Sequence, residues 1–424
     1  MGSGPAASRS GARAVGGVTR TTTGPEPTGG PASAELIAGS RGRVCFYSEL
    51  VYPMLGDSRI EFAGGAEVLV ALLARGLVTR GFQVTVVTCD FGQPRREVLR
   101  GVQVLRTFVP RKGIPILRFF HPRITLATRA LFEADADVYC VYGSGMQAGL
   151  TYDVARLKGR AFVMVAATDY EVVRHPTHHA GARGWYLRAL RGASAMLAQT
   201  GYQQRCLHEH FGIDAGILPN LVEIPEQPVD PGQDGIVLWL ATYKAGKRPE
   251  WFTALARQLP HHRFVMAGVV PPPPLTRQSW DEARAVAGEC PNLEVRGFQS
   301  AEELQKLIRR ASLVVHTSPV EGFSNVMLEA WAAGLPTVSG VDPDDTVKRR
   351  GMGEHVTEFP ALVEAVERLM RDPQARRAAG ARARAYAIEK HAPDVVLDVL
   401  CSVLDRQVEG VRRGRGGAGE RLRR

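Results

Sequence analysis

The feature that most constrains the fold is an alternation of short, β-rich apolar runs with longer helical stretches, which starts at Arg43 and occurs twice along the chain. Strands that alternate with helices in this way form parallel sheets, because a right-handed helical crossover returns the chain to the same end of the sheet. The two series are separated by residues 224–235, where three prolines and two glycines interrupt every periodic pattern. We therefore expect an α/β protein with two domains and a linker between them.

The two series predict two facing Rossmann-like domains with an interdomain cleft. We expect the N-terminal domain over residues 42–223, the linker over 224–235 and the C-terminal domain over 236–385. The expected strands are 44–47, 83–88, 137–142, 161–166 and 195–198 in the first series, and 236–240, 263–267, 293–296, 313–316 and 337–339 in the second. Ligands of open α/β sheets bind outside the carboxyl ends of the strands, so the cleft is the predicted site.

Both ends of the chain differ in composition from the expected domains. Residues 1–41 are rich in small residues, Pro and Arg and nearly lack large apolar side chains, so we predict a disordered tail. Residues 407–424 are predicted to form a second, basic disordered tail, with six arginines against one glutamate between Arg412 and Arg424. Because much of the net charge of +10 lies at the ends, it does not indicate nucleic-acid binding.

A further basic stretch, residues 111–123, mixes cations with apolar residues. This composition suits contact with an anionic membrane surface, and it equally suits a partly buried helix with a solvated face. The six cysteines form no C-x-x-C pair, no apolar run approaches the roughly 20 residues that span a bilayer, and a signal peptide is not recognisable. We expect a cytoplasmic protein, with peripheral contact at the inner membrane face if residues 111–123 bind lipid.

The predicted strand 313–316 is followed by a loop that holds Glu321 and by a helix that begins at Ser324 or Asn325, both good N-cap residues. The free amides of Ser324, Asn325 and Val326 then point away from the helix. Such a helix end carries a partial positive charge and unpaired donors, which favour binding of a diphosphate.

Two glutamates flank this predicted anion site. Glu329 lies on the same helix about one turn beyond its start, and Glu321 precedes the helix. A carboxylate accepts two hydroxyl hydrogen bonds, so Glu329 can hold a ribose diol while Glu321 holds the hydroxyls of a transferred sugar. Two solvated charges would give the same spacing, but the loop-to-helix context and the restart of the α/β pattern favour a binding site.

The E-x7-E pattern from Glu321 to Glu329, followed by residues 330–339, resembles the retaining family 4 glycosyltransferases, also called group 1. The resemblance extends roughly over residues 43–405. It implies the GT-B fold, transfer of a sugar from a nucleoside-diphosphate sugar to a carbohydrate, lipid-linked or small-molecule acceptor, and retention of configuration. It also implies that residues 386–406 form a helix that crosses back to the N-terminal domain, and that no cofactor or metal is required.

Further segments carry the resemblance. Gly64 and Gly65 are similar to the family's glycine turn near the donor phosphates, although a tight turn alone would also explain them. Residues 199–200 and 218–220 are similar to segments before its linker, and residues 237–250 to the strand and basic pair that neutralise the diphosphate. The predicted donor-binding residues are Gly64, Gly65, Lys244, Lys247, Arg248, Glu321, Gly322, Phe323, Ser324, Asn325, Val326 and Glu329.

The chain departs from the family pattern at two places. An arginine is usual near Thr242, and here Lys244 or Arg248 would have to replace it. Many members carry a histidine after the third or fourth strand of the N-terminal domain, where this chain reads Ala167-Thr168-Asp169. Asp169 either orients an acceptor hydroxyl or caps a loop. The predicted catalytic residues are Glu321, Lys247, Arg248 and Asp169.

Other patterns suggest different classes of protein. Residues 143–148 read G-x-G-x-x-A after a strand, with Asp169 closing the next strand, as in a dinucleotide-binding fingerprint of an NAD-dependent enzyme. The missing arginine leaves open a catalytically silent nucleotide-sugar-binding protein. Two D-x-D runs, 135–137 and 342–344, and the histidines of 175–179 resemble metal ligands, but turn and loop positions explain them better, so we predict no metal site.

Overall fold

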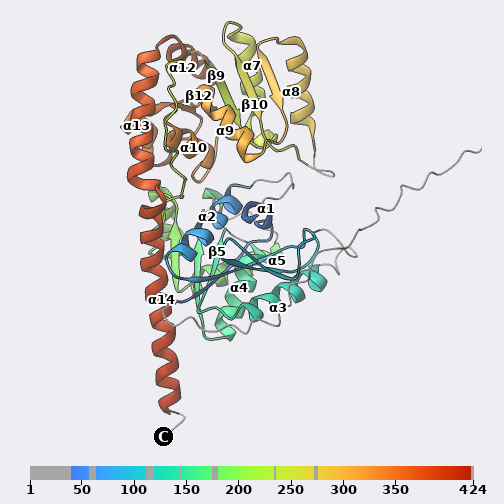
Figure 1. The fold of residues 1–424 in the computed structure, drawn as a ribbon, viewed down its shortest axis with the longest axis vertical. Coiled ribbons are helices and arrows are strands. Elements are labelled where there is room, and N and C mark those ends of the chain that lie inside the picture. The colour runs from blue at the N-terminus through green and yellow to red at the C-terminus, as the bar shows by residue number, and fades with distance from the viewer. Residues whose placement is uncertain are drawn as a thin grey trace, which may run out of the picture. The chain divides into compact units, whose positions relative to one another are not determined.

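The computed structural model describes residues 40–56, 64–110, 119–143, 145–173, 180–233, 235–271 and 276–421. These residues form two mainly parallel sheets with helices on both faces of each, which confirms the predicted fold class (Figure 1). The predicted N-terminal tail, apart from its last two residues, and the basic segment 111–118 lie outside the described residues.

The first sheet has eight strands in the order β3-β4-β2-β1-β5-β6-β7-β8, of which β3 pairs antiparallel with β4 and the others pair in parallel. Its strands are β1 (Arg43–Tyr47), β2 (Gln83–Thr88), β3 (Arg96–Leu99), β4 (Val102–Arg106), β5 (Val138–Tyr142), β6 (Ala161–Val165), β7 (Ala195–Ala198) and β8 (Gly216–Ile217). The helices between them are α1 (Tyr52–Leu55), α2 (Gly65–Thr79), α3 (Thr125–Ala134), α4 (Met146–Leu157), α5 (Ala180–Gly192) and α6 (Gly201–Phe211).

Alternate side chains of the strands supply two cores, one on each face of this sheet. On β1, Val44 and Phe46 join the core under α2, whereas Cys45 and Tyr47 join the core under α3 and α4. Strands buried on both faces read as continuous apolar runs, which is why the sequence pattern identified them.

The second sheet has six parallel strands in the order β11-β10-β9-β12-β13-β14. Its strands are β9 (Ile236–Leu240), β10 (Phe264–Ala267), β11 (Leu293–Arg296), β12 (Ala311–His316), β13 (Thr337–Ser339) and β14 (Gly353–His355). The helices are α7 (Pro249–Gln258), α8 (Gln278–Glu289), α9 (Ala301–Arg309), α10 (Asn325–Ala333), α11 (Thr346–Arg350), α12 (Phe359–Arg371) and α13 (Pro373–His391). Helices α7, α8 and α12 pack on one face, and α9 and α10 on the other.

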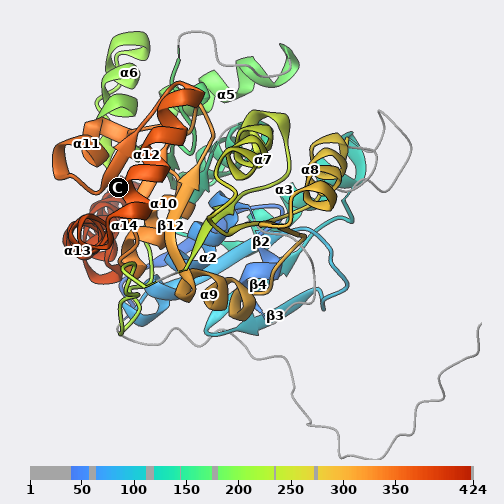
Figure 2. The same cartoon turned by 90° about the horizontal axis from the view of Figure 1, so that it is seen from above.

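The last two helices connect the parts built on the two sheets. Helix α13 ends at His391, and α14 (Pro393–Arg421) continues along the same side of the molecule, so that both are seen nearly end-on in Figure 2. Leu397, Leu400 and Leu404 of α14 belong to the core of the first sheet. We call the part built on the first sheet, together with α14, the N-terminal half, and the part built on the second sheet the C-terminal half.

The structure corrects the prediction at the C-terminal end. The predicted single helix over 386–406 is instead two helices that meet at Pro393, because proline lacks an N–H and disfavours helical geometry in the residue before it. The predicted disordered tail from residue 407 is helical as far as Arg421, and buried Val408 anchors its first turn in the core.

The linker is held by the buried side chain of Arg376. Its guanidinium donates to the carbonyl oxygen of Pro231 at 2.6 Å and to that of Leu369 at 2.8 Å. The segment between the two sheets is therefore fixed to the C-terminal half.

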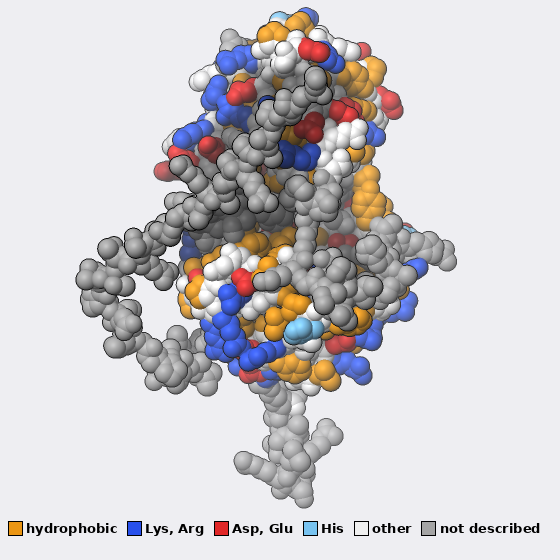
Figure 3. Space-filling model, turned by 90° about the vertical axis from the view of Figure 1, so that its right-hand side faces the viewer, with side chains coloured by type: hydrophobic (Ala, Val, Ile, Leu, Met, Phe, Trp, Pro, Cys, Tyr) orange, Lys and Arg blue, Asp and Glu red, His pale blue; other side chains and the backbone are white. Residues whose placement is uncertain are grey.

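Charged side chains of both signs are interspersed on the face of the described residues shown in Figure 3. None of the helices in the described part of the chain combines the length and the apolar character that crossing a bilayer requires.

Candidate functional site

A cavity of about 360 Å³ lies where the strand order reverses in both sheets. In the first sheet, the strands that follow β1 are added on one side of it and those that follow β5 on the other, so the order reverses between β1 and β5. In the second sheet it reverses in the same way between β9 and β12. Such switch points leave a crevice at the carboxyl ends of the strands. Residues that end β5, β9, β10 and β12 accordingly line the cavity, among them Tyr142, Leu240, Ala267 and His316.

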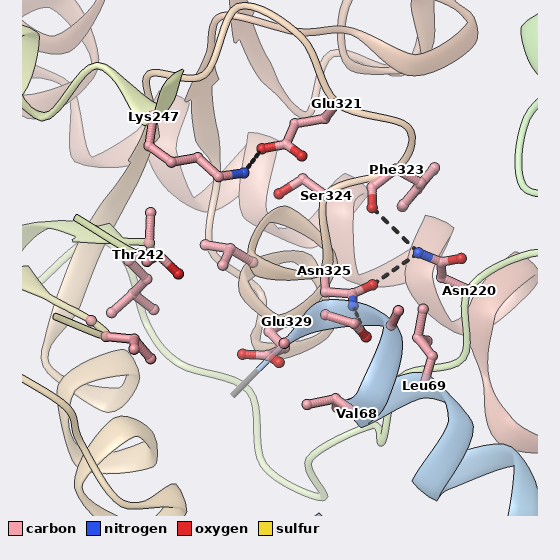
Figure 4. A pocket seen from close by; sticks show the side chains of 18 of the residues that line it. Val68, Leu69, Asn220, Thr242, Lys247, Glu321, Phe323, Ser324, Asn325 and Glu329 are labelled. Atoms are coloured by element: carbon pink, nitrogen blue, oxygen red, sulfur yellow. Dashed lines mark hydrogen bonds and ion pairs between the residues drawn. The ribbon is translucent and has the colours of Figure 1, made fainter. Parts of the chain in front are cut away.

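The C-terminal wall of the cavity contains the start of α10 (Figure 4). Ser324 is the N-cap, and its hydroxyl accepts from the N–H of Met327 at 3.4 Å. The N–H groups of Asn325 and Val326 have no hydrogen-bond partner among the described residues, as expected in a first helical turn. The predicted segment Gly322–Val326 lines the cavity and presents two free donors at the positive end of a helix.

Glu321 is held by two basic side chains. Lys247 forms an ion pair with its carboxylate, and His316 Nε2 lies 3.5 Å from the same oxygen. Burial raises the pKa of Glu321, but the hydrogen bond from His316 and the charge of Lys247 outweigh it and lower the pKa to about 2. Glu321 is therefore a carboxylate at neutral pH, with a fixed orientation.

His316 was absent from the predicted site residues. It is the last residue of β12, only 4% exposed, and its Nδ1 lies 3.4 Å from the hydroxyl of Ser339. A carboxylate only accepts hydrogen bonds, so Nε2 carries a proton and points it at Glu321. Its position at the carboxyl end of a buried parallel strand was the signal that could have identified it.

Of the three basic candidates, Lys247 alone lines the cavity within the part of the chain described here. A hydroxyl hydrogen bond from Thr317 to the carbonyl oxygen of Lys247 ties this residue to the end of β12. Lys244 is exposed, and the guanidinium of Arg248 lies over the ring of Trp251, 4.6 Å from its centroid. The structure thus brings one of the predicted cations, and not the other two, to Glu321.

Glu329 lines the cavity from α10, but its surroundings differ from those of Glu321. It is half-buried, and its side chain has no ion pair or hydrogen bond with any described residue. Burial raises the pKa of Glu329 to about 7. Two carboxyl groups of one cavity therefore differ strongly in ionisation, because only Glu321 has cationic partners.

The N-terminal wall includes the turn at Gly64 and Gly65. Gly64 is the N-cap of α2 in an extended conformation, so this turn does not use a positive φ. A Cβ atom on Gly65 would lie 3.0 Å from Nδ2 of Asn325, which donates to the carbonyl oxygen of Gly65 at 2.9 Å. A side chain at position 65 would therefore crowd the amide of Asn325.

Asp169 starts a short 3-10 turn after β6 and lies next to the cavity residue Thr168. Its carboxylate accepts from Nε2 of Gln203 at 3.0 Å. Burial raises the pKa of Asp169 to about 6; the hydrogen bond from Gln203 opposes this shift, and the carboxylates of Asp344 and Glu321 add to it. Asp169 itself does not line the cavity.

The alternative motifs have other roles or positions. Asp344 accepts from the N–H groups of Gly201 and Tyr202 at 2.7 and 2.9 Å and so caps α6, and Asp342 accepts from the N–H of Val347 in α11. Asp135 and Asp137 form ion pairs with Arg43. The glycines at 143 and 145 do not line the cavity.

Among the described residues, one group of side chains converges closely enough to hold a metal ion. His261 and His262 each place Nε2 3.0 Å from the carboxylate of Glu367, which also pairs with Arg371. This group precedes β10 and thus lies at the opposite end of the sheet from the cavity. The histidines of residues 175–179 lie outside the described residues.

Comparisons with known proteins agree with this architecture. Residues 63–224 match the family described as glycosyltransferase family 4, and residues 235–372 match the family described as glycosyl transferases group 1. None of the curated protein sequences compared with the chain is significantly similar to it.

Solved structures share the fold. Sucrose-phosphate synthase from Thermosynechococcus elongatus is 19% identical, with a TM-score of 0.69 over 87% of this chain and 99% of that one. HepE from Anabaena, solved in complex with UDP and glucose, is 15% identical, with a TM-score of 0.65 over 86% of this chain and 99% of that one. A glycosyltransferase from Rickettsia africae is 12% identical, with a TM-score of 0.62 over 86% of this chain and 98% of that one.

Proposed function

Because the chain belongs to the group 1 glycosyltransferases of family 4, with the GT-B fold, we propose that it transfers a sugar from a nucleoside-diphosphate sugar bound in the cavity described above. The observation that carries this proposal is the convergence of Lys247 and Glu321 on the free N-terminus of α10. A cation and unpaired helix amides suit a diphosphate, and an ionised carboxylate beside them suits sugar hydroxyls.

We assign the leaving group to the C-terminal half. Lys247 and the amides of Asn325 and Val326 would stabilise the negative charge that develops on the diphosphate as the glycosidic bond breaks. Lys247 was already a predicted diphosphate contact, whereas neither Lys244 nor Arg248, the candidates to replace the arginine expected near Thr242, lines the cavity. Thr317 holds the backbone of Lys247 and Ser324 caps the helix, so the cavity fixes where these groups start from.

Glu321 would hold the hydroxyls of the transferred sugar, and Glu329 those of the ribose. His316 keeps the carboxylate of Glu321 in place while Lys247 turns to the diphosphate. This division of roles is supported by the two different ionisation states, since a fully ionised acceptor suits the reacting sugar.

We further propose that configuration is retained, as in the family that the motifs resemble. The bond between the anomeric carbon and the β-phosphate oxygen breaks, the acceptor oxygen bonds to the same face of the sugar, and the departing phosphate takes the acceptor proton. No protein nucleophile or metal takes part in these steps, and the proton passes directly from the acceptor to the departing phosphate. Asp169, beside the cavity, would orient the acceptor hydroxyl.

The experiment is a thermal-shift screen of UDP-, GDP- and ADP-sugars, followed by measurement of released nucleoside diphosphate with carbohydrate, lipid-linked and small-molecule acceptors. We expect one donor class to raise the melting temperature and to release nucleoside diphosphate at an unchanged rate in EDTA. Stabilisation without any release would indicate a silent binding protein. Stabilisation by a nicotinamide dinucleotide instead of a nucleotide sugar would contradict the proposal.

A further inference from the structure

Asn220 lies at the meeting point of the two halves. It follows β8 and precedes the linker, and its side chain is 1% exposed. Its amide nitrogen donates to Oδ1 of Asn325 at 2.8 Å and to the carbonyl oxygen of Phe323 at 3.3 Å. Its backbone oxygen accepts from Nδ1 of His391, the last residue of α13. One side chain thus contacts both residues that flank the N-cap of α10 (Figure 4).

The carbonyl oxygen of Gly65, at one end of this chain of hydrogen bonds, fixes the direction of the others. The carbonyl oxygen of Gly65 can only accept, so Asn325 must present Nδ2 to it and Oδ1 to Asn220. Asn220 therefore presents Nδ2 to Asn325 and Oδ1 to Tyr142, whose hydroxyl donates at 2.9 Å. Both polar atoms of the Asn220 side chain are paired, and the acceptor oxygens of Asn325 and Phe323 fix the orientation of its amide.

Close packing accompanies this bridge. A Cβ atom on Gly322 would lie 2.8 Å from the carbonyl oxygen of Ala167 and 3.0 Å from Oε1 of Gln199, both in the N-terminal half. The loop before α10 therefore contacts the N-terminal half directly on the other side of the N-cap. Such a contact tolerates little displacement of the loop.

We propose that Asn220 is a positioning residue that, through Asn325, holds the start of α10 in register with the Gly64–Gly65 turn. This inference rests on the proposed function, because the amides of Asn325 and Val326 are the groups assigned to the diphosphate. Asn220 touches no reacting atom in this scheme. It sets where the donor, bound to the C-terminal half, lies relative to an acceptor on the N-terminal half.

The first test compares the wild type with Asn220→Ala and the nearly isosteric Asn220→Asp, which replaces the donating amide by an acceptor facing two oxygens. We expect kcat for transfer to fall about 10-fold to 100-fold in both, since small displacements of reacting groups are costly. The dissociation constant of UDP should change less than about 3-fold, because the diphosphate contacts lie in the other half. The fraction of donor that is hydrolysed instead of transferred should rise, because misaligned walls exclude water less well.

Asn292→Ala serves as the matched control. Asn292 donates to three backbone carbonyl oxygens of the C-terminal half, those of Ala256, Leu259 and His262, and lies away from the cavity. Its loss should lower the melting temperature while kcat and the hydrolysed fraction stay near the wild-type values. A purely structural role for Asn220 would give the same pattern and would overturn the inference.

A double-mutant cycle tests the bridge from its other end. Asn325→Ala should reduce kcat as Asn220→Ala does, and the double variant should be no worse than either single one, because both remove one interaction. Additive losses would overturn the inference even if Asn220→Ala folds poorly. An inactive wild type with every donor would overturn the proposed function as well, whereas an active wild type with unaffected Asn220 variants overturns this inference alone.

Discussion

The two walls of the cavity differ in chemistry. The C-terminal wall carries the ionisable side chains Lys247, His316, Glu321 and Glu329, and the N-terminal wall carries glycines and neutral hydroxyl and amide groups, namely Gly64, Gly65, Tyr142, Gln199 and Asn220. One wall is therefore suited to binding charge, and the other to shaping and aligning what is bound. Variants of the first wall should change donor affinity or the chemical step, and those of the second should change kcat without changing donor affinity.

The largest effect is expected for Glu321→Gln. Loss of the ionised acceptor beside the reacting sugar should lower kcat by about 10²- to 10³-fold. The variant frees Lys247 from its ion pair, so UDP should bind at least as tightly as to the wild type. Nucleoside-diphosphate release and a UDP titration measure the two effects, and a fully active variant would remove Glu321 from the mechanism.

Lys247→Ala should come next. We expect kcat/KM to fall about 100-fold, because a charge-assisted contact with the diphosphate is lost. Lys244→Ala and Arg248→Ala are the matched controls, since both remove a cation from the same turn but neither side chain lines the cavity. A larger loss in either control would reassign the diphosphate contact.

Where the loop before α10 touches the neutral wall, Gly322→Ala should lower kcat about 10-fold with little change in UDP affinity. The added methyl group would press on Ala167 and Gln199 and push the halves apart. Equal losses in kcat and in UDP affinity would contradict the division between the two walls.

The smallest effect concerns pH. Free Glu329 has a pKa of about 7, and a ribose diol that donates to the carboxylate should lower this pKa in the complex. Nucleotide binding should therefore release protons near pH 7, and affinity should weaken as the pH falls from 8 to 6, by at most about 10-fold per pH unit. Glu329→Gln should abolish this pH dependence in calorimetric titrations, and an unchanged dependence would assign it to another group.

What the sequence predicted well depends on local pattern. Most strands of both sheets and the N-cap at Ser324 follow from runs of adjacent residues. Strands β3, β4, β8 and β14 were missed: β3 is an exposed edge strand with charged residues, and β8 and β14 are two and three residues long. The helical end of α14 was missed because its glycines and arginines favour disorder, and the core packing of Val408 is not visible in a local pattern.

For the site, too, only local sequence patterns could be used. Glu321 and Lys247, which line the cavity, could be predicted because they lie in short motifs, but the bridge from Asn220 to Asn325 joins residues 105 positions apart. No local pattern encodes such a pairing, since it arises only when the two sheets face each other. The exclusion of Lys244 and Arg248 from the cavity likewise depends on the geometry of a single turn.

Titration of UDP into the wild type, Lys247→Ala and Asn220→Ala tests the account most directly. We predict that Lys247→Ala weakens binding about 10-fold or more, as expected for loss of a charged contact, and that Asn220→Ala binds like the wild type. Wild-type affinity in Lys247→Ala together with lost binding in Asn220→Ala would contradict the assignment of charge binding to the C-terminal wall.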